Sequence, residues 1–181
     1  GFLNGNLYAL LLPLLFAVLG IMHMNALTAG DEDAGRLELL LALPTSRVSV
    51  YLSRFVSVVL VLAAVALLVG ATVVLGGTAL DMNLETTGVV AATVSVFLLG
   101  LFHAALTLAL AGIGLRAGVV LAGSLGVLVL GYLVHALLPM IESLSFLTRS
   151  SPWHWALGEQ PLESGFAGAG IALLVGGSAV L

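Results

Sequence analysis

Long apolar runs alternate with short charged segments along the chain. Aspartate, glutamate, lysine and arginine are absent from five runs, namely residues 1–30, 55–80, 86–115, 117–141 and 164–181. A transmembrane helix needs about 20 mostly apolar residues and satisfies its own backbone polar groups. The pattern therefore predicts one all-α domain, a polytopic transmembrane helix bundle with five spans, over about residues 7–29, 55–77, 88–113, 118–140 and 165–181.

Arginine is distributed unevenly between the two sides that these spans define. Alternation places segment 30–54 and the link before residue 117 on one side, and segments 78–87 and 141–164 on the other. The first side carries four arginines and the second carries one: Arg36, Arg47, Arg54 and Arg116 against Arg149. Short arginine-rich loops stay in the cytoplasm. We therefore expect segment 30–54 to be cytoplasmic and segment 141–164 to face outward from a cell membrane.

Composition supports the membrane class and excludes others. Hydrophobic residues make up 61% of the chain and charged residues 8%, against about 45–50% and about 25% in soluble domains. This excludes a soluble domain, a disordered segment and a nucleic-acid-binding protein. The absence of cysteine excludes disulfides and thiolate metal sites. Because the chain starts at Gly1 and ends within an apolar run, we expect it to be a piece of a longer protein, with sequence missing at both ends.

The predicted cytoplasmic segment contains signals for a short helix and a break. Acidic residues 31–33 favour a helix N-terminus, where they complement the helix dipole. The leucine-rich run 37–43 is too short to span and is typical of a helix at the membrane surface or against a partner. Pro44 is expected to end this helix, and Thr45 or Ser46 to cap the next one. A helix that merely connects two spans is the alternative interpretation.

Between residues 32 and 47 the chain has an acidic start, a glycine, a Leu-Glu-Leu-Leu-Leu run, a proline and a Ser-Arg pair. This order resembles the loop between the second and third spans of ABC-2-type ABC transporter permeases. The resemblance implies a coupling helix that docks on a cytoplasmic ABC ATPase subunit. The coupling residues it implies are Gly35, Arg36, Leu37, Glu38, Leu39, Leu40, Leu41, Pro44, Ser46 and Arg47. Val48 and Ser49 depart from the pattern, because family members often carry further basic residues there.

A second stretch supports the same resemblance. Ser151-Pro152-Trp153 is followed by Gly158 and by a Pro-Leu pair at residues 161–162, as in segments before the final span of many such permeases, on the outer side. The resemblance implies that the spans here correspond to the second to sixth of six. It also implies an exporter in the cytoplasmic membrane, in which a second permease copy or a homologous half helps to enclose the pathway. It does not imply a particular substrate.

No enzymatic site is predicted in the chain. An ATP site needs a glycine-rich loop with a lysine, and the chain has no lysine. Neither a Gly-x-Ser-x-Gly elbow nor a His-Glu-x-x-His string occurs. We therefore predict no catalytic residue, no cofactor and no metal site, and we expect the energy for transport to come from the ATPase partner.

The histidines allow two interpretations. His103 and His135 lie within predicted spans, where an ionisable residue is a functional hypothesis. The alternative, which we favour, is a neutral imidazole hydrogen-bonded to a neighbouring helix. His23, beside two methionines, is weak evidence for a soft-metal site. His154, between two tryptophans, is typical of an aromatic belt at the membrane interface.

Small residues at four-residue spacing predict close helix packing. They form two stripes, Gly100 with Ala104, and Gly118 with Ala122 and Gly126. Such stripes let helix backbones approach closely within a bilayer. We favour packing within the chain for both stripes, and the alternative is a seam against a second copy.

The residues also allow two interpretations in which the protein has no ATPase partner. The chain could be a membrane enzyme or assembly factor whose working surface is the outer segment 142–164, or a scaffold that transports nothing. An ATP-driven exporter is the interpretation that the coupling-loop resemblance favours.

Overall fold

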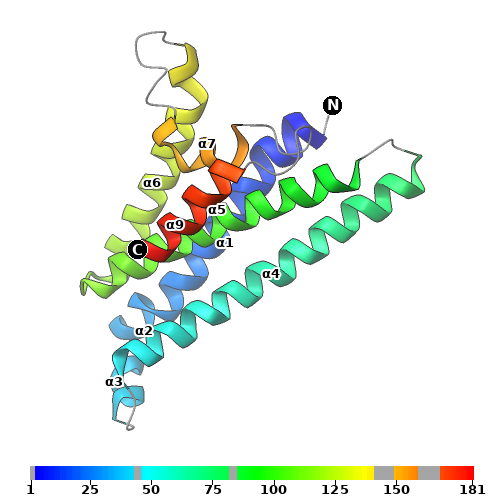
Figure 1. Ribbon diagram of the computed structural model, residues 1–181. Helices are drawn as coiled ribbons and strands as arrows, with labels where there is room; N and C mark the ends of the chain where they lie inside the picture. Colours follow the sequence, from blue (N-terminus) through cyan, green and yellow to red (C-terminus); the bar gives the residue numbers. More distant parts are fainter. Residues whose placement is uncertain (1–2, 43–45, 82–84, 141–148, 159–167) are drawn as a thin grey trace.

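A computed structural model describes residues 3–42, 46–81, 85–140, 149–158 and 168–181. These residues form helices and contain no strand, which confirms the predicted all-α bundle (Figure 1). In chain order the helices are η1 (Leu3–Leu11), α1 (Leu12–Leu27), α2 (Ala29–Asp33), α3 (Arg36–Leu41), α4 (Arg47–Ala79), α5 (Thr86–Gly112), α6 (Ala117–Leu137), η2 (Leu138–Met140), α7 (Pro152–Leu157) and α9 (Gly168–Val180).

Four helical stretches are long and apolar enough to cross a membrane. They are Leu7–Asp33, Arg47–Ala79, Thr86–Gly112 and Ala117–Leu137, and they overlie the first four predicted spans. The fifth predicted span overlaps α9, which has 13 residues. At 1.5 Å per residue α9 is about 20 Å long, shorter than the hydrocarbon core of about 30 Å. Residues 165–167 of that prediction lie outside the described residues.

Helix α5 is the centre of the bundle. It packs against α1, α4, α6, α7 and α9, and in Figure 1 it lies between α4 on one side and α7 and α9 on the other. Within the most apolar window of each helix, 67% of α5 is buried against 11% of α4. Most of the α4 surface is therefore free to face lipid, whereas α5 is enclosed by the chain itself.

Small side chains explain why α1 can pack so closely on α5. A Cβ atom on Gly20 of α1 would lie 2.6 Å from the carbonyl oxygen of Gly100, and a Cβ on Gly100 would lie 2.8 Å from that of Phe16. The Ala104 methyl group lies against the same face of Gly20. Backbone meets backbone at this crossing, as small residues permit in membrane bundles. The stripe of Gly100 and Ala104 thus packs within the chain, as expected.

The second stripe behaves differently, and our expectation for it was wrong. Gly118 and Ala122 of α6 are exposed and Gly126 is half-buried. A Cβ atom on Gly118 or Gly126 would have no neighbour within 4 Å among the described residues. The reason is that α6 presents another face to the bundle, whose buried residues are Val120, Ser124 and Leu128.

The expected surface helix over residues 31–43 is interrupted. The chain forms α2, then a turn at Ala34 and Gly35, and then α3. Gly35 has φ +71°, a left-handed conformation that glycine adopts without steric cost. The helix signal was correct for each half, but the left-handed glycine breaks the helix between them.

The start of α4 confirms one of the two expected caps. The Ser46 hydroxyl oxygen accepts a hydrogen bond of 3.1 Å from the Ser49 amide, which satisfies a free N–H group in the first turn. Pro44, the expected end of the preceding helix, and Thr45, the other candidate cap, lie outside the described residues.

Candidate functional site

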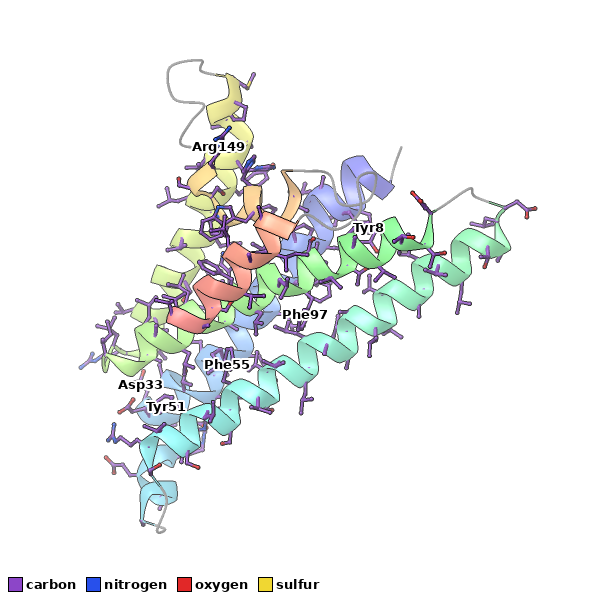
Figure 2. All side chains as sticks on the ribbon, viewed as in Figure 1. Tyr8, Asp33, Tyr51, Phe55, Phe97 and Arg149 are labelled. Atoms are coloured by element: carbon purple, nitrogen blue, oxygen red, sulfur yellow. The ribbon has the colours of Figure 1, made fainter. Side chains whose placement is uncertain are left out.

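Three consecutive carboxylates in α2 bind three different parts of the molecule. Asp31 pairs with arginines of α3 and α4, Glu32 faces the first turns of α4, and Asp33 accepts a hydrogen bond from the backbone of α6. We call these residues the acidic triplet. Figure 2 shows Asp33 and Tyr51 at the same end of the molecule, opposite Arg149. We call the end that holds α2 and α3 the arginine-rich end.

Arg54 is the most deeply placed cation of this group. Its Nη2 atom lies 2.9 Å from Oδ2 of Asp31, and their side chains are 10% and 16% exposed. Its Nη1 atom donates to the carbonyl oxygen of Leu27, the last residue of α1. A cation at a helix C-terminus satisfies a free carbonyl and complements the dipole. Arg54 thus joins α4 to both α1 and α2.

Arg36 holds α3 against α2. After the turn at Gly35, its Nη2 and Nε atoms both lie 2.7 Å from Oδ1 of Asp31. The Arg36 side chain is 63% exposed, so solvent screens this pair more than the Arg54 pair. The contact sets the direction in which α3 leaves α2.

Glu32 makes the weaker contacts of the triplet. Its Oε1 atom lies 3.7 Å from Nη1 of Arg47, and the side chains are 35% and 64% exposed. The Tyr51 hydroxyl donates to Oε2 of Glu32 over 3.4 Å. Long, exposed contacts of this kind contribute about 0–1 kcal/mol, so they guide the start of α4 rather than fix it.

Asp33 reaches the start of α6. Its Oδ2 atom accepts a hydrogen bond of 2.9 Å from the amide of Ala117, 84 positions away in sequence. The first amides of a helix have no partner within the helix, and a carboxylate there also complements the dipole. The acidic residues were expected to serve the helix that they begin, whereas Asp33 serves a different one.

The outer surface of α3 is exposed. Leu39 is 75% exposed and Glu38 is exposed as well. The side chains of Leu37, Leu40 and Leu41 lie outside the described part of the structure. Glu38 and Leu39 therefore place an acid and an apolar side chain side by side at the surface of α3.

The opposite end of the molecule contains α7, which packs inside the bundle. The Ser151 hydroxyl accepts from the Trp153 amide at 3.2 Å and donates to the Gly131 carbonyl of α6 at 2.7 Å. Trp153 is fully buried, and its ring lies 5.0 Å from that of Tyr132. Trp153 is therefore enclosed by the bundle, because Gly131 leaves room for the indole against α6. Residues 161–162 of the motif lie outside the described residues.

The histidines do not form a site together. His103 is fully buried, and its Nδ1 atom lies 2.9 Å from the Leu99 carbonyl. That partner belongs to its own helix, so the expected bond to a neighbouring helix was wrong. His135 and His154 lie with ring centroids 6.1 Å apart. Across the described ranges, no three metal-binding side chains lie together.

An apolar groove of about 650 Å³ runs between α4 and α5. Its α4 wall consists of small and branched residues, including Ala66, Gly70 and Val74, and Phe97 of α5 lies across from them. Thr93 is the polar residue of the lining, and its hydroxyl is already bonded to Tyr8 and to the Val89 carbonyl. The groove thus offers an uncharged surface.

The sequence predicted the cytoplasmic segment 30–54 but not the contacts that the acidic triplet makes with α4 and α6. The signal for the Arg54 pair was present, because Arg54 and Arg36 lie on the same predicted side as the acidic residues. No local pattern connects Asp33 with Ala117, because the two residues are 84 positions apart. They meet because α5 brings the chain back to the end of the molecule that holds α2. Among the described coupling residues, Arg36 pairs with Asp31, and Ser46 and Arg47 begin α4.

Apolar helices of spanning length, with a charge cluster at one end, define a polytopic α-helical membrane protein. Comparison with protein families gave a match to the family described as Multidrug efflux system permease Rv1217c, C-terminal domain, over residues 5–181. The chain belongs to this family and is a transporter permease domain, which indicates a transport subunit rather than an enzyme. This is consistent with the resemblance to permeases of ABC-2-type exporters. Searches of curated proteins and of solved structures found no match.

Proposed function

We propose that the chain is the membrane-spanning part of an ABC-2-type exporter, driven by a separate cytoplasmic ATPase that docks on the outer side of the segment formed by α2 and α3. The observation that carries the proposal is that one side of this segment is bonded to the helix bundle and the other side is exposed. Ion pairs and hydrogen bonds of the acidic triplet fasten its inner side to α4 and α6, while its outer side exposes Glu38 and Leu39. A segment built in this way can receive a partner and pass its displacement to the helices.

The charges support a cytoplasmic position for this docking surface. Arg36, Arg47 and Arg54 all bind the acidic triplet, so the residues that bias topology lie at the same end as α2 and α3. The 181 residues contain no lysine, so they do not supply the lysine of a phosphate-binding loop. An ATPase in another subunit then provides the energy.

The coupling residues divide into two roles in this proposal. Arg36 and Gly35 orient α3, because one pairs with Asp31 and the other makes the turn. Glu38 and Leu39 contact the ATPase, together with the remaining residues of the matched pattern: Leu37, Leu40, Leu41 and Pro44. Ser46 and Arg47 begin α4, which carries the movement into the membrane.

The cargo in this proposal is an apolar or amphipathic compound that moves outward across the cytoplasmic membrane. The description of the family as a multidrug efflux permease supports such cargo. The uncharged groove between α4 and α5 gives the bilayer-facing side of the domain a surface compatible with it.

A second permease copy or homologous half completes the pathway in this proposal. Its contact surface is the exposed stripe of Gly118 and Ala122 on α6, which no described residue of the chain covers. Because the chain has no cysteine, Ala122→Cys introduces a single thiol. We expect this thiol to form a disulfide with its counterpart in a homodimer, and no disulfide in the matched variant Leu68→Cys on lipid-facing α4.

The test of the main proposal is co-purification with the ATPase subunit from membranes that contain the full-length permease. Leu39→Asp and Glu38→Arg alter exposed residues of α3, and we expect both to reduce ATPase binding and transport. Leu80→Asp is the matched control, because Leu80 is 73% exposed at the opposite end of α4. Unchanged ATPase binding in both α3 variants would exclude this docking surface. Transport that persists without any ATPase would favour a protein with no ATPase partner.

A further inference from the structure

The hydrogen bond from Ala117 to Asp33 is part of a packed joint between α2 and α6. Beneath it, Ala29 of α2, Ala111 of α5 and Val120 of α6 form a small buried cluster, with exposures of 1%, 1% and 0%. The hydrogen bond therefore lies beside a buried apolar contact between α2, α5 and α6. Two kinds of interaction, one polar and one apolar, hold α2 and the start of α6 together.

Helix α2 is also fastened on its other side. Asp31, two residues before Asp33, pairs with Arg54 of α4, which bonds in turn to the end of α1. Five residues of α2 thus lie between contacts to α1, α4 and α6. A displacement of α2 either moves the start of α6 or breaks the solvent-exposed bond between Asp33 and Ala117.

Helix α6 connects this joint with the other end of the molecule. Near its outer end, the Gly131 carbonyl accepts the hydrogen bond of Ser151, at the start of α7. Figure 1 shows α6 running from the region of α2 to the region of α7. A 21-residue helix is about 30 Å long and moves as a stiff element. Movement of its first turn therefore reaches α7.

We infer that Asp33 is a positioning residue that links the docking segment to α6, and through α6 to α7. This link is additional to the direct continuation of the docking segment into α1 and α4. The inference rests on the proposed function for the origin of the movement. It assigns to α6 the task of carrying ATPase-driven displacement to the outer half of the domain.

Two substitutions remove the same hydrogen bond from opposite sides. Asp33→Leu removes the acceptor. Ala117→Pro removes the donor and keeps the helix start, because proline is favoured at the first helical position. Asp33→Asn keeps an acceptor oxygen without the charge and serves as the conservative variant. Glu85→Leu is the control, because the Glu85 side chain makes no capping bond to α5.

The experiment measures ATPase co-purification, ATP hydrolysis and substrate transport for the full-length permease with its ATPase in vesicles. We expect Asp33→Leu and Ala117→Pro to keep ATPase binding and hydrolysis but to lower transport per ATP about tenfold, within the usual range of coupling between sites. Asp33→Asn and Glu85→Leu should keep transport per ATP within about twofold of the unmodified protein.

The outcomes separate this inference from the proposed function. Unchanged transport per ATP in Asp33→Leu and Ala117→Pro would overturn the link through α6 and leave the ATPase docking intact. Loss of ATPase binding in Ala117→Pro would also overturn it, because the joint would then belong to the docking surface. If Asp33→Leu does not fold, Ala117→Pro still decides the question. Failure of Leu39→Asp to weaken ATPase binding would instead count against the proposed function.

Discussion

The guanidinium group of Arg54 and the carboxylate of Asp31 form a largely buried ion pair, 2.9 Å long, between α4 and α2. Arg54 also bonds to the Leu27 carbonyl, so one side chain holds the end of α1, the acidic triplet and the first part of α4. Truncating one partner of a buried pair leaves the other charge uncompensated. The ion pair therefore favours movement of α1, α2 and α4 together.

Arg54→Leu is expected to destabilise the domain by about 1–3 kcal/mol, because it leaves the Leu27 carbonyl and part of the Asp31 carboxylate without a donor. The melting temperature in detergent, followed by circular dichroism, measures this loss. Arg47→Leu is the control. Its ion pair is 3.7 Å long and its side chain is 64% exposed, so it should cost at most about 1 kcal/mol. Equal losses in the two variants would contradict the central role of Arg54.

Gly100→Ala is expected to separate α1 from α5. The new methyl carbon would lie 2.8 Å from the Phe16 carbonyl oxygen, and a backbone atom cannot turn aside as a side chain can. We expect a loss of about 1–3 kcal/mol, visible as a lower melting temperature and a broader size-exclusion peak. Gly126→Ala on α6 adds a methyl group where no neighbouring atom of the described residues lies within 4 Å. It should be neutral or stabilising, and a loss of stability as large as that of Gly100→Ala would refute the assignment.

Tryptophan fluorescence distinguishes the buried Trp153 from an interfacial residue. The chain has two tryptophans, so the Trp155→Phe variant reports on Trp153, which is fully buried. We expect its emission to be blue-shifted and its quenching by iodide to be weak. The Trp153→Phe variant reports on Trp155, which is half-buried, and should be quenched more strongly. Similar quenching of the two variants would show that α7 does not enter the bundle.

The turn between α2 and α3 is expected to tolerate asparagine at position 35 but not valine. Gly35 has φ +71°, and no described neighbour lies within 4 Å of the position of a Cβ atom, so we expect the effect to arise from the backbone. A left-handed conformation costs most residues about 1–2 kcal/mol, and asparagine less. Hydrogen exchange of the Ala42 amide, which bonds to Glu38, measures the stability of α3. It should become faster in Gly35→Val and change little in Gly35→Asn. Equal protection in both would mean that Gly35 is not needed for this turn.

The charged and uncharged pattern was sufficient to predict the membrane class and the positions of four long helices. Charges in hydrocarbon are so costly that their absence marks a span. The distribution of charges also separated the arginine-rich segment from the rest. Thr45 and Ser46 were recognisable as candidate helix caps from their place after a proline, and the structure shows that Ser46 caps α4. These properties depend on local sequence and on the contrast between water and lipid.

The choice of which helix face meets which neighbour required the tertiary structure. In water, the buried face of a helix is apolar and the exposed face polar, but a helix in lipid is apolar on every side. The stripes of Gly100 and Gly118 therefore look alike in sequence, although the first contacts the α1 backbone and the second contacts no described residue.

The contacts of the acidic triplet also depend on the tertiary structure. Asp31 and Asp33 are alike by sequence, yet one binds Arg54 and the other the first amide of α6. Sequence alone determined that this chain spans a membrane with its positive charge at one end. Packing around α5 determined which helices those charges connect, because it brings the starts of α4 and α6 within hydrogen-bonding distance of α2.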